Sequence, residues 1–295
     1  MRRLTWRKTA CAVLPLLLSP VIGSSARAFD GSVSKSAWQP HPLEINPGGI
    51  VNAAGYASQV APGSIAAAFG NFVVPVPMWD AALPLATELE GLSLPWSSAC
   101  APGGSVCPNV VIEGLAPLFY VSAGQVNLQI PWAMAASVPG QSQWLDLIAV
   151  ALNGESGATQ TVDVVPFAPG IFTINAEGTG QGAVLDASGR LVDSSNPASA
   201  GAYLEIYCTG LGLVTNPPDT GSPALSNPLS WAMTMPAVTI AGAPAPVSFY
   251  GLAPGYVGLY QVNVQVPAGL TANDAAPVIL TIAGVQSNTV TVAIQ

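Results

Sequence analysis

A seven-residue segment that occurs twice constrains the fold of this chain more than any other feature. Gln125-Val-Asn-Leu-Gln-Ile-Pro131 returns as Gln261-Val-Asn-Val-Gln-Val-Pro267, 136 positions later. Upstream, Gly114-Leu-Ala-Pro117 returns as Gly251-Leu-Ala-Pro254, and further matches lie in the same order. Matched segments in one order indicate an internal duplication, so we expect two domains of the same fold.

The repeated segment has the period of a β-strand. Val126, Leu128 and Ile130 alternate with three amides, which predicts a half-buried strand with one apolar and one polar face. Turn-forming segments separate further strand-like runs; they are Asn153-Gly154, Ala283-Gly284 and Asp186-Ala-Ser-Gly189. With 30 Gly and 28 Pro the chain leaves little room for helix, and Ala81 to Leu89 is a candidate for one or two helical turns. The pattern predicts an all-β protein of two tandem immunoglobulin-like antiparallel β-sandwich domains related by internal duplication.

The chain divides into four predicted parts. Residues 1–28 form a signal peptide, residues 29–46 a flexible leader, residues 47–168 the first β-sandwich domain and residues 169–295 the second. The boundary between the domains rests on Pro166-Phe-Ala-Pro169, because two prolines in four residues end the last strand of the first copy.

The first 28 residues predict export. A basic segment, Met1 to Lys8, precedes an apolar stretch, Thr9 to Ile22, and Ala26-Arg27-Ala28 is a small-x-small cleavage site. The apolar stretch is shorter than the about 20 residues of a spanning helix, so we expect cleavage and no membrane insertion afterwards. The expected location is extracellular or at the cell surface, with the periplasm as the alternative.

The charge balance excludes whole classes of partner. After residue 28 the chain holds two basic residues, Lys35 and Arg190, against fifteen acidic ones, which gives a net charge of −13. This balance leaves no basic patch for a phosphate backbone, so we expect no nucleic-acid partner. An anionic membrane surface is disfavoured for the same reason.

Three cysteines remain once Cys11 leaves with the signal peptide. Cys100 and Cys107 bracket a turn-rich segment, and export permits disulfides, so we expect a bridge between them. Cys208 ends the run Leu204-Glu-Ile-Tyr-Cys208, where alternation places it on the apolar face with Leu204 and Ile206. We expect a buried, unreactive thiol at that position.

The residues that common hydrolytic reactions need are scarce. His41 is the one histidine of the chain and lies in the leader, which argues against a serine hydrolase. Four carboxylates are candidates for a glycosidase pair, although no spacing certifies them: Asp80, Glu88, Glu90 and Glu113. Gly178-Thr-Gly-Gln-Gly182 lacks the lysine of a phosphate-binding loop and is better interpreted as a turn, and the sequence has no calcium-loop motif. We therefore predict no catalytic, cofactor-binding or metal-ligating residue and no cofactor.

The polar face of the repeated strand is the candidate binding surface. It carries six amides that could bind sugar hydroxyls or the edge of a partner's sheet: Gln125, Asn127, Gln129, Gln261, Asn263 and Gln265. The alternative, which we favour, is that these amides hydrogen-bond adjacent loops of their own chain. Trp132 follows the first amide strand, and with Trp79 and Trp96 it is a candidate stacking platform for carbohydrate, although tryptophan packs more often in a core.

Several motifs resemble a family of secreted bacterial proteins, the Solibacter-type uncharacterised C-terminal domain. The matching segments include Val51-Asn-Ala-Ala54, Ala61-Pro-Gly-Ser64, Gly124-Gln-Val-Asn127, Ala168-Pro-Gly-Ile-Phe172, Gly180-Gln-Gly-Ala183, Tyr207-Cys-Thr-Gly-Leu-Gly212 and Ser287-Asn-Thr-Val290. The resemblance implies a tandem immunoglobulin-like sandwich of the kind found in exported proteins. It implies no catalytic residue, because none is established for that family.

These observations predict an exported, non-enzymatic interaction or structural module of the cell surface or the extracellular space. Association with a protein or with a second copy, through an exposed strand edge or an apolar patch, is the first hypothesis, because few charges guard the edges. Carbohydrate binding through tryptophan and amide side chains is the alternative, and a secreted glycoside hydrolase comes last. Exposed coplanar rings would favour sugar, whereas buried rings would favour packing.

Overall fold

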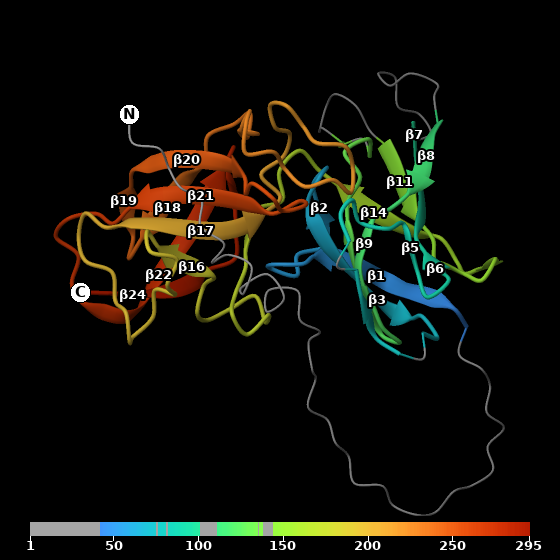
Figure 1. Ribbon diagram of the computed structural model, residues 1–295, viewed down its shortest axis with the longest axis horizontal. Helices are drawn as coiled ribbons and strands as arrows, with labels where there is room; N and C mark the ends of the chain where they lie inside the picture. Colours follow the sequence, from blue (N-terminus) through green and yellow to red (C-terminus); the bar gives the residue numbers. More distant parts are fainter. Residues whose placement is uncertain (1–41, 75, 81, 101–110, 135, 138–143) are drawn as a thin grey trace, which may run out of the picture.

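The computed structural model describes residues 42–295 except residues 75, 81, 101–110, 135 and 138–143. The predicted signal peptide, most of the predicted leader, His41 and Cys107 lie outside the described residues. The described strands fall into two groups that lie side by side (Figure 1): residues 44–164, here the first half, and residues 170–294, the second half.

The first half contains two larger sheets and one small one. The first sheet has the order β1 (Glu44–Asn52), β3 (Ile65–Asn71), β10 (Gln125–Gln129), β9 (Leu118–Val121) and β4 (Met78–Trp79). The second has the order β2 (Gln59–Val60), β14 (Gln160–Val164), β11 (Trp144–Ile148), β7 (Pro95–Cys100) and β8 (Val111–Leu115). The small sheet joins β13 (Glu155–Ser156), β12 (Ala151–Leu152), β6 (Leu92–Ser93) and β5 (Glu88–Leu89).

The second half contains two sheets. One has the order β15 (Gly170–Ile171), β17 (Tyr203–Thr209), β21 (Tyr260–Gln265) and β20 (Val247–Leu252), and β16 (Val184–Asp186) also pairs with β17. The other has the order β19 (Ala243–Ala245), β18 (Ala237–Ile240), β22 (Asn273–Ile282) and β23 (Val285–Gln286), and β24 (Val290–Ile294) also pairs with β22.

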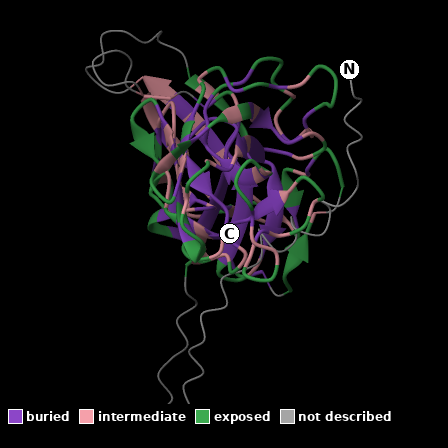
Figure 2. Cartoon of the chain, turned by 90° about the vertical axis from the view of Figure 1, so that its left-hand side faces the viewer, coloured by how far each residue is buried: buried purple, intermediate pink, exposed green. Residues whose placement is uncertain are grey.

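Each half encloses an apolar core of its own between its sheets. Leu128 and Ile148 meet in the first core from opposite sheets, and Val262 and Leu280 meet in the same way in the second. Figure 2 shows the buried residues inside and the exposed ones at the periphery. The prediction of an all-β protein with tandem antiparallel sandwiches is confirmed, and two sheets packed over one core are the immunoglobulin-like arrangement.

The two halves pair their central strands in the same register. Gln129 of β10 lies opposite Ile65 of β3, and Gln265 of β21 lies opposite Tyr203 of β17. Ile65 and Tyr203 are equivalent positions, since each follows a glycine, Gly63 or Gly201, by two residues. Two predicted hairpin turns are confirmed: Asn153-Gly154 joins β12 to β13, and Ala283-Gly284 joins β22 to β23. All four turn residues have positive φ, the backbone conformation that two-residue hairpins require.

Two details differ from the sequence-based expectation. β1 begins at Glu44, inside the predicted leader, because Ile45 is fully buried in the first core. The helical turns expected within Ala81 to Leu89 are absent from the described residues of that segment. Asp80 accepts hydrogen bonds from the backbone N–H groups of Ala82 at 2.9 Å and Ala86 at 2.6 Å, so a carboxylate takes the donors that a helix would pair with its own carbonyls.

Within residues 42–295, as far as they are described, no helix is long and apolar enough to span a membrane.

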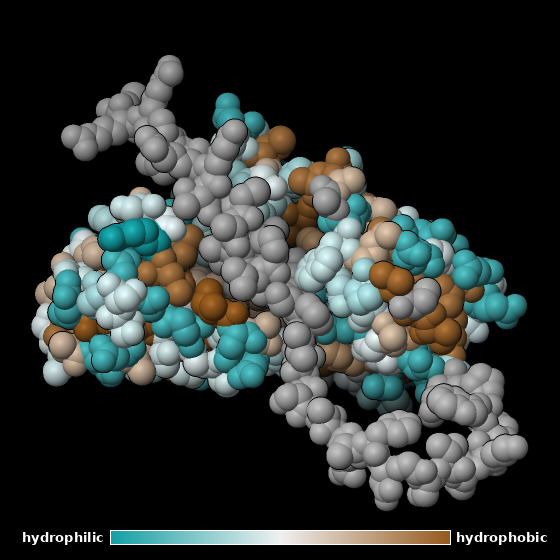
Figure 3. All heavy atoms as spheres, turned by 60° about the horizontal axis from the view of Figure 1, so that its bottom comes forward, coloured by the Kyte–Doolittle hydropathy of each residue, from teal (hydrophilic) through white to brown (hydrophobic). Residues whose placement is uncertain are grey.

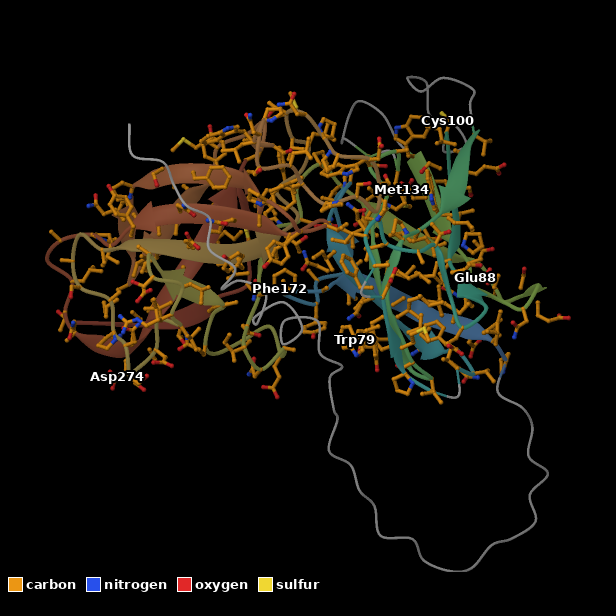
Figure 4. The ribbon with its side chains drawn as sticks, in the orientation of Figure 1. Trp79, Glu88, Cys100, Met134, Phe172 and Asp274 are labelled. Carbon is orange, nitrogen blue, oxygen red and sulfur yellow. The ribbon has the colours of Figure 1, made fainter. Side chains whose placement is uncertain are left out.

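A third apolar cluster joins the two halves. It combines Ile65, Phe119 and Tyr120 of the first half with Phe172, Tyr207 and Leu259 of the second. Phe172 lies between the halves in Figure 4. Thr209 Oγ1 accepts a hydrogen bond from Ile65 N at 2.8 Å across the same contact. Apolar burial and buried hydrogen bonds therefore hold the halves against each other.

Candidate functional site

The repeated amides hydrogen-bond to one another in the same way in both halves. In the first half, Gln125 Nε2 donates to Asn127 Oδ1 at 2.8 Å. In the second half, Gln261 Nε2 donates to Asn263 Oδ1, also at 2.8 Å. Because the apolar residues of β10 and β21 point into the two cores, the amides lie on the opposite face of each strand.

The third amide of each row bonds to a loop of its own half, and in the first half, where Gln129 Nε2 donates to Gly63 O at 3.4 Å, it also bonds to the second half. Gln265 Nε2 donates to Gly201 O at 3.0 Å, inside the second half. Gln129 Oε1 accepts from Gly221 N at 2.7 Å, and this bond crosses from the second half to the first. The same repeat position therefore closes a local loop in both halves, and in the first half it also joins the two halves.

Burial limits what the amides can contact. Four of them are buried: Gln125, Asn127, Gln129 and Gln261. β10 is buried on both faces, contrary to the predicted half-buried strand, because the second half and neighbouring side chains cover its amide face. The hydrogen bonds support the role of tying loops together. Ligand binding by the amides stays a prediction, for which the half-buried Asn263 and Gln265 are the accessible candidates.

The three tryptophans considered for a platform lie in different surroundings. Trp96 is buried in the first core. The Trp132 ring lies against Gly63, where an added Cβ would be 2.2 Å from it, and it also packs against the second core. Trp79 is 42% exposed. Two of the rings are therefore packing residues, and the three form no common platform.

Trp79 lies on the outward face of the first amide row. It sits opposite Tyr120 of β9, which in turn lies opposite Asn127 of β10. The ring centroids of Trp79 and Tyr120 are 4.4 Å apart, and the planes are inclined by 41°. Figure 4 shows Trp79 and Cys100 at opposite ends of the first half.

Trp231 holds a corresponding place in the second half. It pairs with Gly251 of β20, which lies opposite Gln261 of β21. Its ring lies 4.8 Å from that of Phe249 at 65°, and 5.5 Å from that of Tyr250 at 79°. Each half therefore adds an exposed tryptophan beyond the strand next to its amide row. Sequence reasoning missed this correspondence, because residues around positions 79 and 231 share no motif.

The segment with Trp231 extends the sheet beyond β20 by two further chain segments. Val214 bridges Ala232, and Met233 N donates to Leu213 O at 2.9 Å. Val214 and Ala232 belong to the second core. Because side chains alternate between faces, Leu213, Trp231 and Met233 point outward.

The outward face of this extension is mostly apolar, with Thr215 as a polar member. We call Leu213, Trp231, Met233 and Met235 the Trp231 patch; their side chains are 54%, 37%, 69% and 58% exposed. An antiparallel sheet with one solvated face ordinarily carries polar residues on that face. Contiguous exposed apolar residues are typical of interaction surfaces, so the patch is the strongest candidate site.

The free strand edges are weaker candidates than this patch. β1 is interrupted by a register shift between Ile45 and Ile50, β19 contains Pro244, and β8 carries Glu113 at its centre. Bulges, prolines and central charges are the devices that keep edges from pairing with other chains. Of the two routes to association predicted from the sequence, the geometry favours the apolar patch.

A second group of exposed apolar residues surrounds Trp79: Val73, Val76, Met78 and Leu83. Figure 3 shows hydrophobic surface on both halves. Charge separates the two groups. Asp80 follows Trp79 directly, and Glu88 and Glu90 lie in the next hairpin, whereas residues 206–273 contain a single charged residue, Asp219.

The carboxylates considered for glycosidase chemistry lie on several elements of the first half. Both Asp80 oxygens are bonded to backbone N–H groups, and Glu88, Glu90 and Glu113 are exposed on β5, its turn and β8. Among the described residues, no group of three or more His, Cys, Asp and Glu could hold a metal. Asp146 is the carboxylate with the most perturbed surroundings. It is buried, accepts a hydrogen bond from Ser98, and burial raises its pKa to about 6.

The cysteines follow the sequence-based expectation where the structure describes them. Cys208 is fully buried in the second core with Leu204 and Ile206, and burial raises the pKa of its thiol well above the ordinary value. This confirms a buried thiol with little thiolate character. Cys100 ends β7, next to the pair Ala99 and Val111 that closes the hairpin with β8. Cys107 lies outside the described residues, so the Cys100–Cys107 bridge stays a prediction.

Comparisons with known proteins give structural likeness alone. No protein-family model and no curated protein matches the chain, so the resemblance to the Solibacter-type family stays a prediction. The chain is similar to the I9–I11 tandem of titin, at 10% identity and a TM-score of 0.21, with 80% of this chain and 62% of that one covered. It is similar to a biofilm-associated protein BSP domain, at 12% identity and 0.21, with 86% and 29% covered. It is also similar to bovine butyrophilin, at 12% identity and 0.22, with 80% and 94% covered. The chain spans less than two thirds of the titin and biofilm-associated chains, and these scores support no statement about function.

Proposed function

We propose that this chain is an exported, non-enzymatic module that binds protein through the Trp231 patch. The observation that carries the proposal is the outward face of Leu213, Trp231 and Met233, which is apolar although its inner neighbours already fill the core. Trp231 is held in place by Phe249 and Tyr250, and a rigid aromatic anchor is the commonest centre of a protein interface. The adjacent methionines adapt their shape to a partner.

Export and the internal duplication are part of the same proposal. The basic segment, the apolar stretch and the cleavage site of residues 1–28 support export. The shared register of β3–β10 and β17–β21, with the repeated amide pairs, supports the duplication. The absence of catalysis is supported by the use of Asp80 as a loop anchor.

Methionine oxidation tests the proposal inside one molecule. Besides Met1, the chain holds Met78, exposed in the first half, the buried Met134, and the two methionines of the patch. Dilute hydrogen peroxide converts accessible methionines to sulfoxides, which mass spectrometry counts residue by residue. We expect Met233 and Met235 to be protected in the culture of the exporting cell relative to the purified chain diluted to a concentration at which it is monomeric, with Met78 unchanged as the exposed control. Equal oxidation in both samples refutes the proposal.

Carbohydrate binding is the second candidate, and one observation favours it. Asn263 lies opposite Phe249, on the outward face that also carries Trp231, and it is half-buried rather than buried. The rings around Trp231 are inclined by 65° and 79° rather than coplanar, which favours protein over sugar. A glycan array with Trp231→Ala and Trp79→Ala separates the two. Specific binding lost in Trp231→Ala alone establishes the carbohydrate function.

A further inference from the structure

We infer that the partner of the Trp231 patch is a second copy of this chain, in a two-fold contact of patch against patch. The inference rests on the proposed function and names its partner. It starts from charge. Residues 42–295 carry Arg190 as their one basic residue, and its guanidinium is 3.1 Å from the Asp186 carboxylate. Two copies therefore repel each other wherever acidic residues face one another.

The part of the chain that forms the patch carries little charge. The 68 residues from 206 to 273, which include the whole patch, hold one acid, Asp219. The exposed group around Trp79 differs, because Asp80, Glu88 and Glu90 follow within the next eleven residues. A basic partner would be drawn to the acidic surfaces rather than to this uncharged one. An uncharged apolar surface on an acidic protein is suited to contact with another uncharged apolar surface, such as the same patch on a second copy.

The composition of the patch is self-complementary. In a two-fold contact the same residues meet from both copies, so Trp231 of one copy faces Trp231, Met233 or Met235 of the other. Thioether and aromatic groups attract each other, and methionine fills irregular gaps. Gly251 opposite Trp231 and the buried Phe249 keep the tryptophan ring fixed from below. The contact therefore needs little reorganisation of either copy.

The exposed area predicts a weak, reversible dimer. Four side chains of this size at about half exposure present roughly 100 Å² each, which makes about 400 Å² per copy and about 800 Å² for the pair. This area is below the about 1,200 Å² of a standard specific interface and in the range of weak, transient contacts, so we expect a dissociation constant on the order of 100 μM. Added salt should tighten the dimer, because it screens the repulsion between two acidic copies. The Debye length falls from about 30 Å at 0.01 M to about 3 Å at 1 M.

Sedimentation equilibrium on the purified chain tests the inference. We expect self-association that strengthens about tenfold between low and high salt. Met233→Glu and Met233→Lys should each prevent association, because like charges then face each other across the two-fold axis. An equimolar mixture of the two variants should restore it, because opposite charges then meet. Met78→Glu, on the exposed group of the first half, is the matched control and should associate like the wild type.

Two results overturn the inference. One is a wild-type chain that stays monomeric at every concentration and salt; the other is association that Met78→Glu abolishes and Met233→Glu leaves intact. The oxidation experiment separates this failure from failure of the proposed function. A monomeric purified chain whose Met233 is nevertheless protected in culture has a different protein as partner, so the proposed function stands and self-association falls. A monomeric chain with Met233 oxidised equally in both samples refutes both.

Discussion

Replacing Gln129 by alanine tests how the two halves are joined. The Gln129 side chain is fully buried, and its Oε1 is 2.7 Å from Gly221 N, which is itself buried. Gln129→Ala leaves that N–H without its acceptor, which costs about 1–3 kcal/mol. The space left by the missing side chain adds about 1 kcal/mol. We expect the free energy of unfolding to fall by about 2–4 kcal/mol.

The repeat supplies a matched control for this variant. Gln265 occupies the same position in the second half, but it is only half-buried and bonds to the exposed Gly201. Gln265→Ala should therefore lower the free energy of unfolding by about 1 kcal/mol or less. Urea unfolding followed by tryptophan fluorescence measures both variants against the wild type. Equal losses in the two variants would show that the bond between the halves contributes nothing beyond a local loop contact.

Three further perturbations probe other parts of the fold. Burial raises the pKa of Asp146 from 3.8 to about 6, so the folded state favours its protonated form and loses stability as the pH rises through about 6. The difference corresponds to at most about 3 kcal/mol, and about 1–2 kcal/mol after solvent screening. Asp146→Asn should stabilise the protein by that amount near pH 8 and much less near pH 4; an effect independent of pH contradicts this origin. Gly258→Ala places a Cβ 2.8 Å from a backbone oxygen of the first half at φ +62°, whereas Gly255→Ala meets nothing within 4 Å. Thermal unfolding should show that the free energy of unfolding falls by about 2–3 kcal/mol in Gly258→Ala and by about 1 kcal/mol in Gly255→Ala. The reverse order would exclude the close contact at Gly258. If Cys100 and Cys107 are bridged, replacing both by serine should lower stability by roughly 2–2.5 kcal/mol in urea, and an unchanged midpoint argues against the bridge.

The sequence pattern correctly predicted the central strands and two hairpin turns, because these depend on residues close together in the chain. The alternation around Val126 and Val262 gives the central strands, and the pairs Asn153-Gly154 and Ala283-Gly284 give hairpins, because period and turn chemistry act over a few residues. The helical expectation within Ala81 to Leu89 was wrong, since a side chain outside the predicted segment binds the backbone donors inside it.

Contacts between distant segments could not be predicted in this way. The amide face of β10 is buried by residues of the second half, which no pattern within the strand reports. The Trp231 patch depends on the pairing of residues 230–233 with β20 and of residues 213–215 with residues 231–233, and these segments contain no regular alternation long enough to be interpreted as strands. Sequence reasoning therefore missed the site.

The contact between the halves changes what evolution can exchange. In a surface protein whose tandem domains do not contact each other, genetic recombination can replace one domain and leave its neighbour intact. Here such a replacement would expose Ile65 or Tyr207 to water, and it would leave the Gly221 N–H without its acceptor. After the duplication proposed above, the hydrogen bond between Gln129 and Gly221 made each copy depend on the other. The unit that recombination must move intact is the pair, and its halves can diverge in sequence only along paths that keep them fitted to each other.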